Sequence, residues 1–413
     1  MANQLDITKL KQEIKDTIRR NSDRGFVPYG GCNRVCIVME ATLRSADEYQ
    51  QNGDVQTAFD INIMVLLETV RLIAHADDSS GGCGDIIDHC LSKIDEICGN
   101  VAINANKHFF TTLIKTAKNK AFEGWAEWAY QLLKTAVYFV TDRNDAKQIT
   151  DLFPVLGKMF DDMDYPDKYL INLGIIERLE GKDAARKYLF ENLEQDELRE
   201  IAVAEAIGDK DFDLAENLCK AALRKDARGY NGRVSQWLYH LETIYETTGE
   251  QSKLIDTVLT ILLNGNCAYF AKLKALYIQQ GIWEQERLPL WKALSKRSSA
   301  GYVSLLADER EFELLLEQIQ KTPSYIIDYG KLLATEFPDE AYRIYQEYIL
   351  EVAAQSKDKR EYRRVCKYLK NFAKAGAPDE TMALIEQLSE KYARRPAMLY
   401  ELQAVKSEIE CRG

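Results

Sequence analysis

Short breaks divide the second half of the chain into helix-length segments, and this pattern limits the fold more than any other feature. Several breaks are followed by alanine and a new apolar stripe, as in GKDAARKYL, GDKDFDLAENL and PDEAYRIY. A helix–turn–helix unit of this kind cannot cover its own apolar face, so neighbouring units must stack. The pattern predicts an all-α solenoid of stacked helical hairpins with degenerate, tetratricopeptide-like repeats. The breaks lie at 179–182, 206–209, 247–250, 279–282, 307–310, 336–340 and 374–380.

The first half also shows helical periodicity, with apolar residues spaced at three and four positions in 5–20, 35–46, 58–73 and 86–98. Longer apolar helices follow from about residue 107. A polar break at 161–168 then precedes the repeats. These features predict two parts. Residues 1–165 form an N-terminal helical subdomain that carries the turn ADDSSGG, and residues 166–413 form a C-terminal helical-repeat region.

Composition narrows the class of protein. With 54 Lys plus Arg against 65 Asp plus Glu, the net charge is −11, which disfavours indiscriminate binding to DNA or anionic membranes. No apolar stretch is long enough to span a bilayer, and the first residues lack the apolar core of a secretory signal. Nine scattered cysteines indicate reduced thiols rather than a disulfide framework. We therefore expect a cytoplasmic protein that makes no membrane contact.

The stretch HADDSSGGCGD, residues 75–85, allows three interpretations. As an EF-hand loop it would begin at Asp77, but its fifth position is glycine and its twelfth is aspartate instead of glutamate. As a phosphate loop it lacks the Lys and Ser/Thr of that motif. We favour a rigid corner in which glycines supply unusual backbone angles and Asp85 caps the next helix. The residues of this corner are Asp77, Asp78, Ser79, Gly81 and Asp85.

Candidate metal and catalytic residues are sparse. Cys83, Cys90 and Cys98 surround His89, but Cys90 and Cys98 fall on an apolar stripe, where free cysteine behaves as a small hydrophobe. Cys32 and Cys36 lie one helical turn apart and could supply two zinc ligands, but no matching pair is evident. No known catalytic motif occurs. We expect no cofactor, no metal and no enzymatic activity, and keep as a minor alternative a metal-dependent hydrolase using Asp77, Asp78 and Asp85.

One helix near 357–374 is strongly basic. Its cations share one face, which could hold an acidic partner or a nucleic-acid backbone, although such faces are often simply solvated. Tyr342 and Tyr345 precede this helix and could contact a peptide, or could pack between hairpins. The candidate partner-binding cations are Arg360, Arg363, Arg364, Lys367, Lys370 and Lys374.

Three segments resemble the helical region of bacterial SWIM zinc-finger proteins: RGFVPYGGCNRV (24–35), NGDVQTAFDI (52–61) and LIAHADDSSGGCGDIIDHCL (72–91). The last is similar to an ADDSdG turn associated with that family. The resemblance implies a helical-repeat module attached to a metal-binding finger that binds nucleic acid or protein. The C-x-C and C-x-H ligands of that finger do not occur in this sequence, so neither its zinc ligands nor finger-mediated DNA binding can be transferred. The chain would be part of a longer protein or a stand-alone relative.

The sequence thus predicts a non-catalytic protein-interaction scaffold that binds a protein or peptide. The alternative is a nucleic-acid-associated protein that uses the basic helix 357–374.

Overall fold

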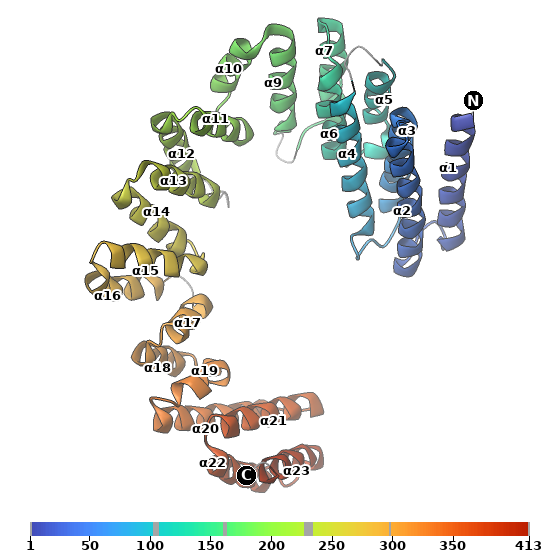
Figure 1. Cartoon of the computed structure of the whole chain (residues 1–413). Helices are drawn as coiled ribbons and strands as arrows, with labels where there is room; N and C mark the ends of the chain where they lie inside the picture. Colours follow the sequence, from blue (N-terminus) through green and yellow to red (C-terminus); the bar gives the residue numbers. More distant parts are fainter. Residues whose placement is uncertain (1, 102–106, 160–162, 227–233, 297–298, 412–413) are drawn as a thin grey trace. The chain divides into compact units, whose positions relative to one another are not determined.

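The computed structural model describes residues 2–101, 107–159, 163–226, 234–296 and 299–411. These residues form α-helices joined by short turns, and the only β-type pairing among them is two isolated bridges. The chain divides into two compact units, Met1–Ala222 and Leu223–Gly413, with the division inside α12 (Phe212–Asp226). Both units are all-α stacks of consecutive helices, so the predicted fold class is confirmed (Figure 1).

The first unit begins with four helices packed side by side. In this bundle α3 is the most buried helix, and it contacts the other three. Buried residues lie on nearly every side of α3, as expected for a helix that other helices surround. The helices are α1 (Ala2–Asn21), α2 (Tyr29–Gln51), α3 (Val55–Ile73) and α4 (Gly82–Asn100).

Shorter helices extend this core. The ring of Phe59 in α3 lies 4.6 Å from that of Phe109 in α5, and Phe109 stacks on Phe139 at 6.0 Å. One continuous hydrophobic core therefore runs from Ile14 to Ile175. The helices up to α9 extend this core, and α10 and α11 follow it in the first unit: α5 (Lys107–Ala117), α6 (Ala126–Ala136), α7 (Arg143–Thr150), α8 (Phe153–Leu156), α9 (Asp167–Glu180), α10 (Lys182–Glu191) and α11 (Asp196–Gly208).

The structure has no unit boundary at residue 165. Helix α9 packs on α6, and Lys134 forms an ion pair with Asp167. Residues on both sides of position 165 thus pack on α6, where the ring of Tyr130 lies 4.9 Å from that of Tyr165. Of the break at 161–168, residues 161 and 162 lie outside the described ones, 163–166 are not helical, and α9 begins at Asp167, within the first unit.

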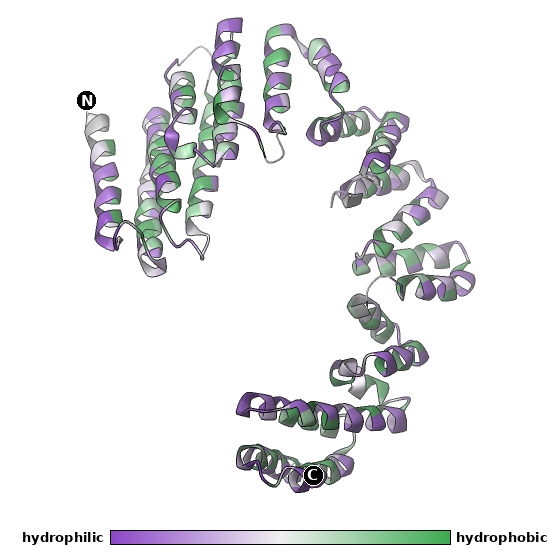
Figure 2. Cartoon of the chain, turned by 180° about the vertical axis from the view of Figure 1, so that it is seen from behind, coloured by the Kyte–Doolittle hydropathy of each residue, from purple (hydrophilic) through white to green (hydrophobic). Residues whose placement is uncertain are grey.

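The second unit is a succession of hairpins in which each helix packs mainly on helices one or two places away along the chain. All the breaks predicted from 179–182 to 374–380 coincide with ends of helices. Figure 2 shows why neighbours are needed, since most of these helices are hydrophobic on one side only. The helices are α13 (Val234–Thr248), α14 (Gln251–Leu263), α15 (Phe270–Gln279), α16 (Trp283–Leu294), α17 (Ser299–Asp308), α18 (Phe312–Lys321), α19 (Ile326–Leu333), α20 (Pro338–Gln355), α21 (Lys359–Lys374), α22 (Pro378–Lys391) and α23 (Pro396–Glu410).

Within the described residues, no helix combines the length and apolar character needed to cross a bilayer.

Candidate interaction surface and helix corner

Helix α21 is the basic helix expected from the sequence. It begins at an Asp358 cap, whose carboxylate accepts a hydrogen bond from the amide of Glu361 at 2.9 Å. Its apolar residues are buried against neighbouring helices, while its cations lie on the opposite side and are mostly exposed. The buried residues are Tyr362, Val365, Cys366, Leu369 and Phe372.

One edge of this basic face is neutralised within the chain. Arg363 lies 3.2 Å from the carboxylate of Glu401, and Lys370 forms an ion pair with Glu408. Both acids belong to α23, which packs along α21. These two of the six candidate cations therefore help to join the two helices.

The other four cations form what we call the basic row: Arg360, Arg364, Lys367 and Lys374. All four are exposed, and none has an ion pair with any residue in the part of the chain that the structure describes. At 1.5 Å per residue, the row extends for about 21 Å along the helix. An extended peptide of about six residues has the same length. The row is therefore a positive strip on a chain whose net charge is −11.

The predicted tyrosines mainly join α20 to α21. Tyr345 is 1% exposed and its ring stacks on Phe372 at 5.0 Å, and burial raises the pKa of its hydroxyl to about 12. Tyr342 is half-buried, with its ring edge toward the same Phe372 at 5.7 Å. Packing between hairpins, one of the two fates that the sequence allowed, is therefore the role of Tyr345, which has no surface to offer a partner.

The corner at 75–85 has the predicted glycine turn but a different cap. Gly81 adopts a left-handed conformation, with φ of +78°, and α4 starts directly after it. The carboxylate that accepts hydrogen bonds from the first turn is Asp78, at 2.9 Å from the amide of Cys83 and 3.3 Å from that of Gly84. The prediction that Asp85 caps this helix is wrong, because the helix starts three residues earlier and Asp85 already lies within its first turn.

The corner does not have the form of a calcium loop. Asp77 and Ser79 are hydrogen-bonded to each other in a local turn, with the amide of Ser79 3.2 Å from the Asp77 carboxylate. From Gly82 onward the chain is helical, so residues that would complete an EF-hand loop point outward from α4. Nor do Asp77, Asp78 and Asp85 converge. Among the described residues, one group of His, Cys, Asp or Glu side chains brings its possible ligand atoms close together, and it consists of three cysteines.

That cluster consists of Cys32 and Cys36 on α2 and Cys83 on α4, all buried. The Cys83 sulfur lies 3.6 Å from that of Cys32 and 3.9 Å from that of Cys36. Burial raises the pKa of the Cys32 thiol to about 11, whereas the hydrogen bond between Cys36 and Cys83 lowers the pKa of Cys36. Cys90 and Cys98, which the sequence placed on an apolar stripe, are buried farther along α4, and burial raises the pKa of Cys98 to about 12.

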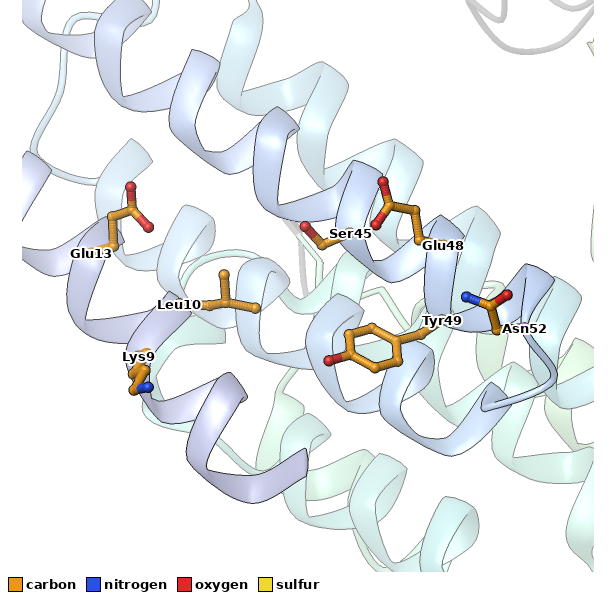
Figure 3. A pocket seen from close by; sticks show the side chains of 7 residues that line it. All are labelled: Lys9, Leu10, Glu13, Ser45, Glu48, Tyr49 and Asn52. Carbon is orange, nitrogen blue, oxygen red and sulfur yellow. The ribbon is translucent and has the colours of Figure 1, made fainter. Parts of the chain in front are cut away.

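A hollow between α1 and α2 was not anticipated from the sequence. It has a volume of about 460 Å³, and Figure 3 shows Leu10 of α1 and Tyr49 of α2 facing it from opposite sides. Both signs of charge surround these two residues. The lining residues are Lys9, Leu10, Glu13, Ser45, Glu48, Tyr49 and Asn52.

Comparisons with known proteins add little to this geometry. No family model matches the sequence, and no curated protein matches it. One solved structure that is similar to the chain is a circular tandem repeat protein with a novel repeat topology, at 13% identity and a TM-score of 0.26, covering 99% of this chain and 96% of that one. Another is the TPR domain of P58(IPK), at 13% identity and a TM-score of 0.23, covering 91% and 98%.

Proposed function

We propose that this chain is a non-catalytic protein-interaction module that binds an acidic segment of a partner protein along the basic row of α21. The observation that carries the proposal is the division of charge on this helix. Arg363 and Lys370 pair with α23, whereas the four residues of the row have no acidic partner among the described residues. A strip of positive charge on a negative protein attracts an acidic ligand without attracting polyanions to the whole surface.

The size of the row defines the ligand. Its length of about 21 Å matches about six extended residues, so we expect a short acidic peptide with several Asp or Glu side chains. Each exposed charge pair contributes about 0.5 kcal/mol, so four pairs contribute about 2 kcal/mol at low salt. Binding through the row alone is therefore weak and sensitive to salt, and further contacts on neighbouring hairpins must supply the remaining affinity.

The test is a fluorescence-anisotropy titration of the full chain with an octameric Asp/Glu-rich peptide and a neutral peptide of equal length. We expect the double variant Arg360→Ala with Arg364→Ala to bind the acidic peptide about fivefold more weakly, because two pairs of about 0.5 kcal/mol are lost. Arg343→Ala is the matched control, since Arg343 is an exposed cation that pairs with Glu347 on the same helix, α20. Its affinity should equal that of the unchanged chain.

Three results would count against the proposal. The first is no binding of the acidic peptide at low salt, and the second is equal weakening by Arg343→Ala. The third is tighter, row-dependent binding of single-stranded DNA, which would favour the nucleic-acid alternative. Turnover of a substrate by the purified chain would contradict the non-catalytic part.

We also propose that the chain is a helical-repeat module of the SWIM zinc-finger type and works in the cytoplasm. The resemblance of residues 24–35, 52–61 and 72–91 supports the first statement. Free, mostly buried thiols suit a reducing compartment and support the second. A C-x-C…C-x-H segment encoded in the same or an adjacent reading frame would agree with this family context. If no such segment is encoded there, the family context would lose its support.

A further inference from the structure

The cysteine cluster has the dimensions of a metal site. The sulfurs of Cys32, Cys36 and Cys83 all lie within 4.8 Å of one another, with separations of 3.6 and 3.9 Å for the two pairs that involve Cys83. In a tetrahedral thiolate site, metal–sulfur bonds of about 2.3 Å place the sulfurs about 3.8 Å apart. A disulfide would require about 2.05 Å, so the three thiols are separate. A small movement of the side chains would let all three sulfurs contact one ion.

A fourth donor is already at the cluster. The Oδ1 atom of Asp78 lies 4.0 Å from the Cys32 sulfur. The amides of Cys83 and Gly84 donate hydrogen bonds to this carboxylate and fix its orientation. Three buried thiols in an apolar core need no carboxylate beside them, as Cys90 on the same helix shows by being buried without one. Besides capping α4, the Asp78 carboxylate beside Cys32 completes a donor set of three thiols and one carboxylate, which zinc accepts.

The backbone around the cluster allows this close approach. The four donors come from one turn of α2, from the corner and from the first turn of α4, so they join segments about fifty positions apart. A Cβ atom on Gly82 would lie 3.2 Å from the Cys36 sulfur, so glycine lets the corner lie close to α2 without displacing this thiol. Two backbone hydrogen bonds already hold the corner, from Val27 to His75 at 2.8 Å and from Asp77 to Val27 at 2.9 Å.

We propose that Cys32, Cys36 and Cys83, with Asp78 as fourth ligand, bind one Zn²⁺ ion that fastens the corner to α2. Binding forms three Zn–S bonds and one Zn–O bond. Three thiol protons pass to the solvent, so the bound ion and its four anionic ligands carry a net charge of −2, as in four-cysteine sites. No electron is transferred. Zinc is favoured over magnesium and calcium because three of the four donors are thiolates. The site does not depend on the proposed function of α21.

The first experiment measures the metal directly on the full chain, purified under reducing conditions without chelator. We expect inductively coupled plasma mass spectrometry to find one zinc ion per chain, and we expect a chelator to release it. With Co²⁺ in place of zinc, the chain should show the sulfur-to-cobalt charge-transfer and visible d–d bands of a tetrahedral thiolate complex. At a hundredfold excess of zinc over Kd, Tm should rise by roughly 5–10 °C.

The second experiment locates the ligands. Cys83→Ala and Cys36→Ala should each lose the zinc and the cobalt bands, and Asp78→Asn should weaken binding. Cys90→Ala is the matched control, because Cys90 is a fully buried cysteine on the same helix outside the cluster. It should keep both signals. A Cys411→Ser background removes the exposed thiol, which could bind metal adventitiously.

The proposal is overturned if the reduced full chain binds no zinc and gives no tetrahedral cobalt spectrum, a result that requires no variant to fold. It is also overturned if Cys83→Ala retains full zinc stoichiometry, or if only Cu⁺ binds to the cluster. Circular dichroism of each variant separates loss of a ligand from loss of the fold. Peptide binding by the basic row provides an independent measurement, since α21 belongs to the other unit.

Discussion

The buried carboxylate of Glu311 offers a sharp test of the second unit. Glu311 is 8% exposed, and its oxygens accept two hydrogen bonds from Arg287 at 2.8 and 2.5 Å and one from the indole of Trp291 at 3.0 Å. These contacts join α16 to α18. Trp291 is itself only 2% exposed, so the Glu311 carboxylate is the acceptor that satisfies its buried N–H.

The size of the effect follows from these exposures. In Glu311→Ala the buried indole N–H loses its acceptor, which costs about 2 kcal/mol. The Arg287 side chain is 40% exposed and can turn to solvent, so losing its ion pair adds only about 1 kcal/mol. A total of about 3 kcal/mol corresponds to a decrease in Tm of roughly 6–12 °C for a unit of this size.

Calorimetry of the full chain at neutral pH measures this decrease. Glu311→Gln is the matched variant, because its amide oxygen still accepts from the indole, and we expect it to cost only about 1 kcal/mol. The reasoning fails if Ala and Gln at this position lower Tm equally, or if the alanine variant unfolds within 2 °C of the unchanged chain (about 1 kcal/mol or less).

Three further predictions follow from single contacts. Asp78→Ala removes the cap of α4 and should lower the free energy of unfolding by about 1 kcal/mol in metal-free urea titrations. Asp85→Ala should change it by less than about 0.5 kcal/mol. The reverse order of the two effects would restore Asp85 as the cap. Gly330→Ala places a Cβ 2.4 Å from the buried ring of Tyr345 and should cost about 1–3 kcal/mol in the same assay, while Gly208→Ala, which meets no atom within 4 Å, should be neutral or stabilising. Because burial raises the pKa of Tyr345 to about 12, the unfolded chain loses this proton first, so stability present below pH 10 should fall as pH rises toward 12. Tyr345→Phe should reduce that alkaline loss of Tm, and an unchanged slope would assign it to other groups.

Most helices after residue 166 could be predicted, because residues that break helices mark many of the turns between them. Breaks such as 247–250 and 374–380 contain Gly or Pro, which end helices for reasons of backbone geometry, and these were predicted; the turns at Gly265 and at Pro323 were not. The turn at 192–195, which lies in the first unit, and the one at 356–358 contain neither residue and were also missed. The second of these ends at the Asp358 cap, a signal that is local but common on surfaces.

The candidate site was harder to predict, because its important contacts join distant positions. Spacing along α21 gave the basic face, but only the packing of α23 distinguishes Arg363 from Arg364. Spacing likewise gave the Cys32–Cys36 pair, whereas Cys83 joins it across 51 positions through a corner whose path no local pattern specifies. For Tyr345 the sequence left peptide contact and packing between hairpins open, and only its contact with Phe372 of α21 decides for packing.

The nearest-neighbour packing of Leu223–Gly413 has a consequence for the history of such a chain. Because each helix there packs mainly on helices one or two places away in the sequence, a hairpin can be duplicated or deleted while side chains farther along the chain keep their surroundings. The number of hairpins can then change between related genes faster than the contacts within each hairpin change. Relatives of this protein should differ by whole hairpins, and a record of shared ancestry should survive longer in contacts such as Trp291–Glu311 than in the alignment of complete sequences.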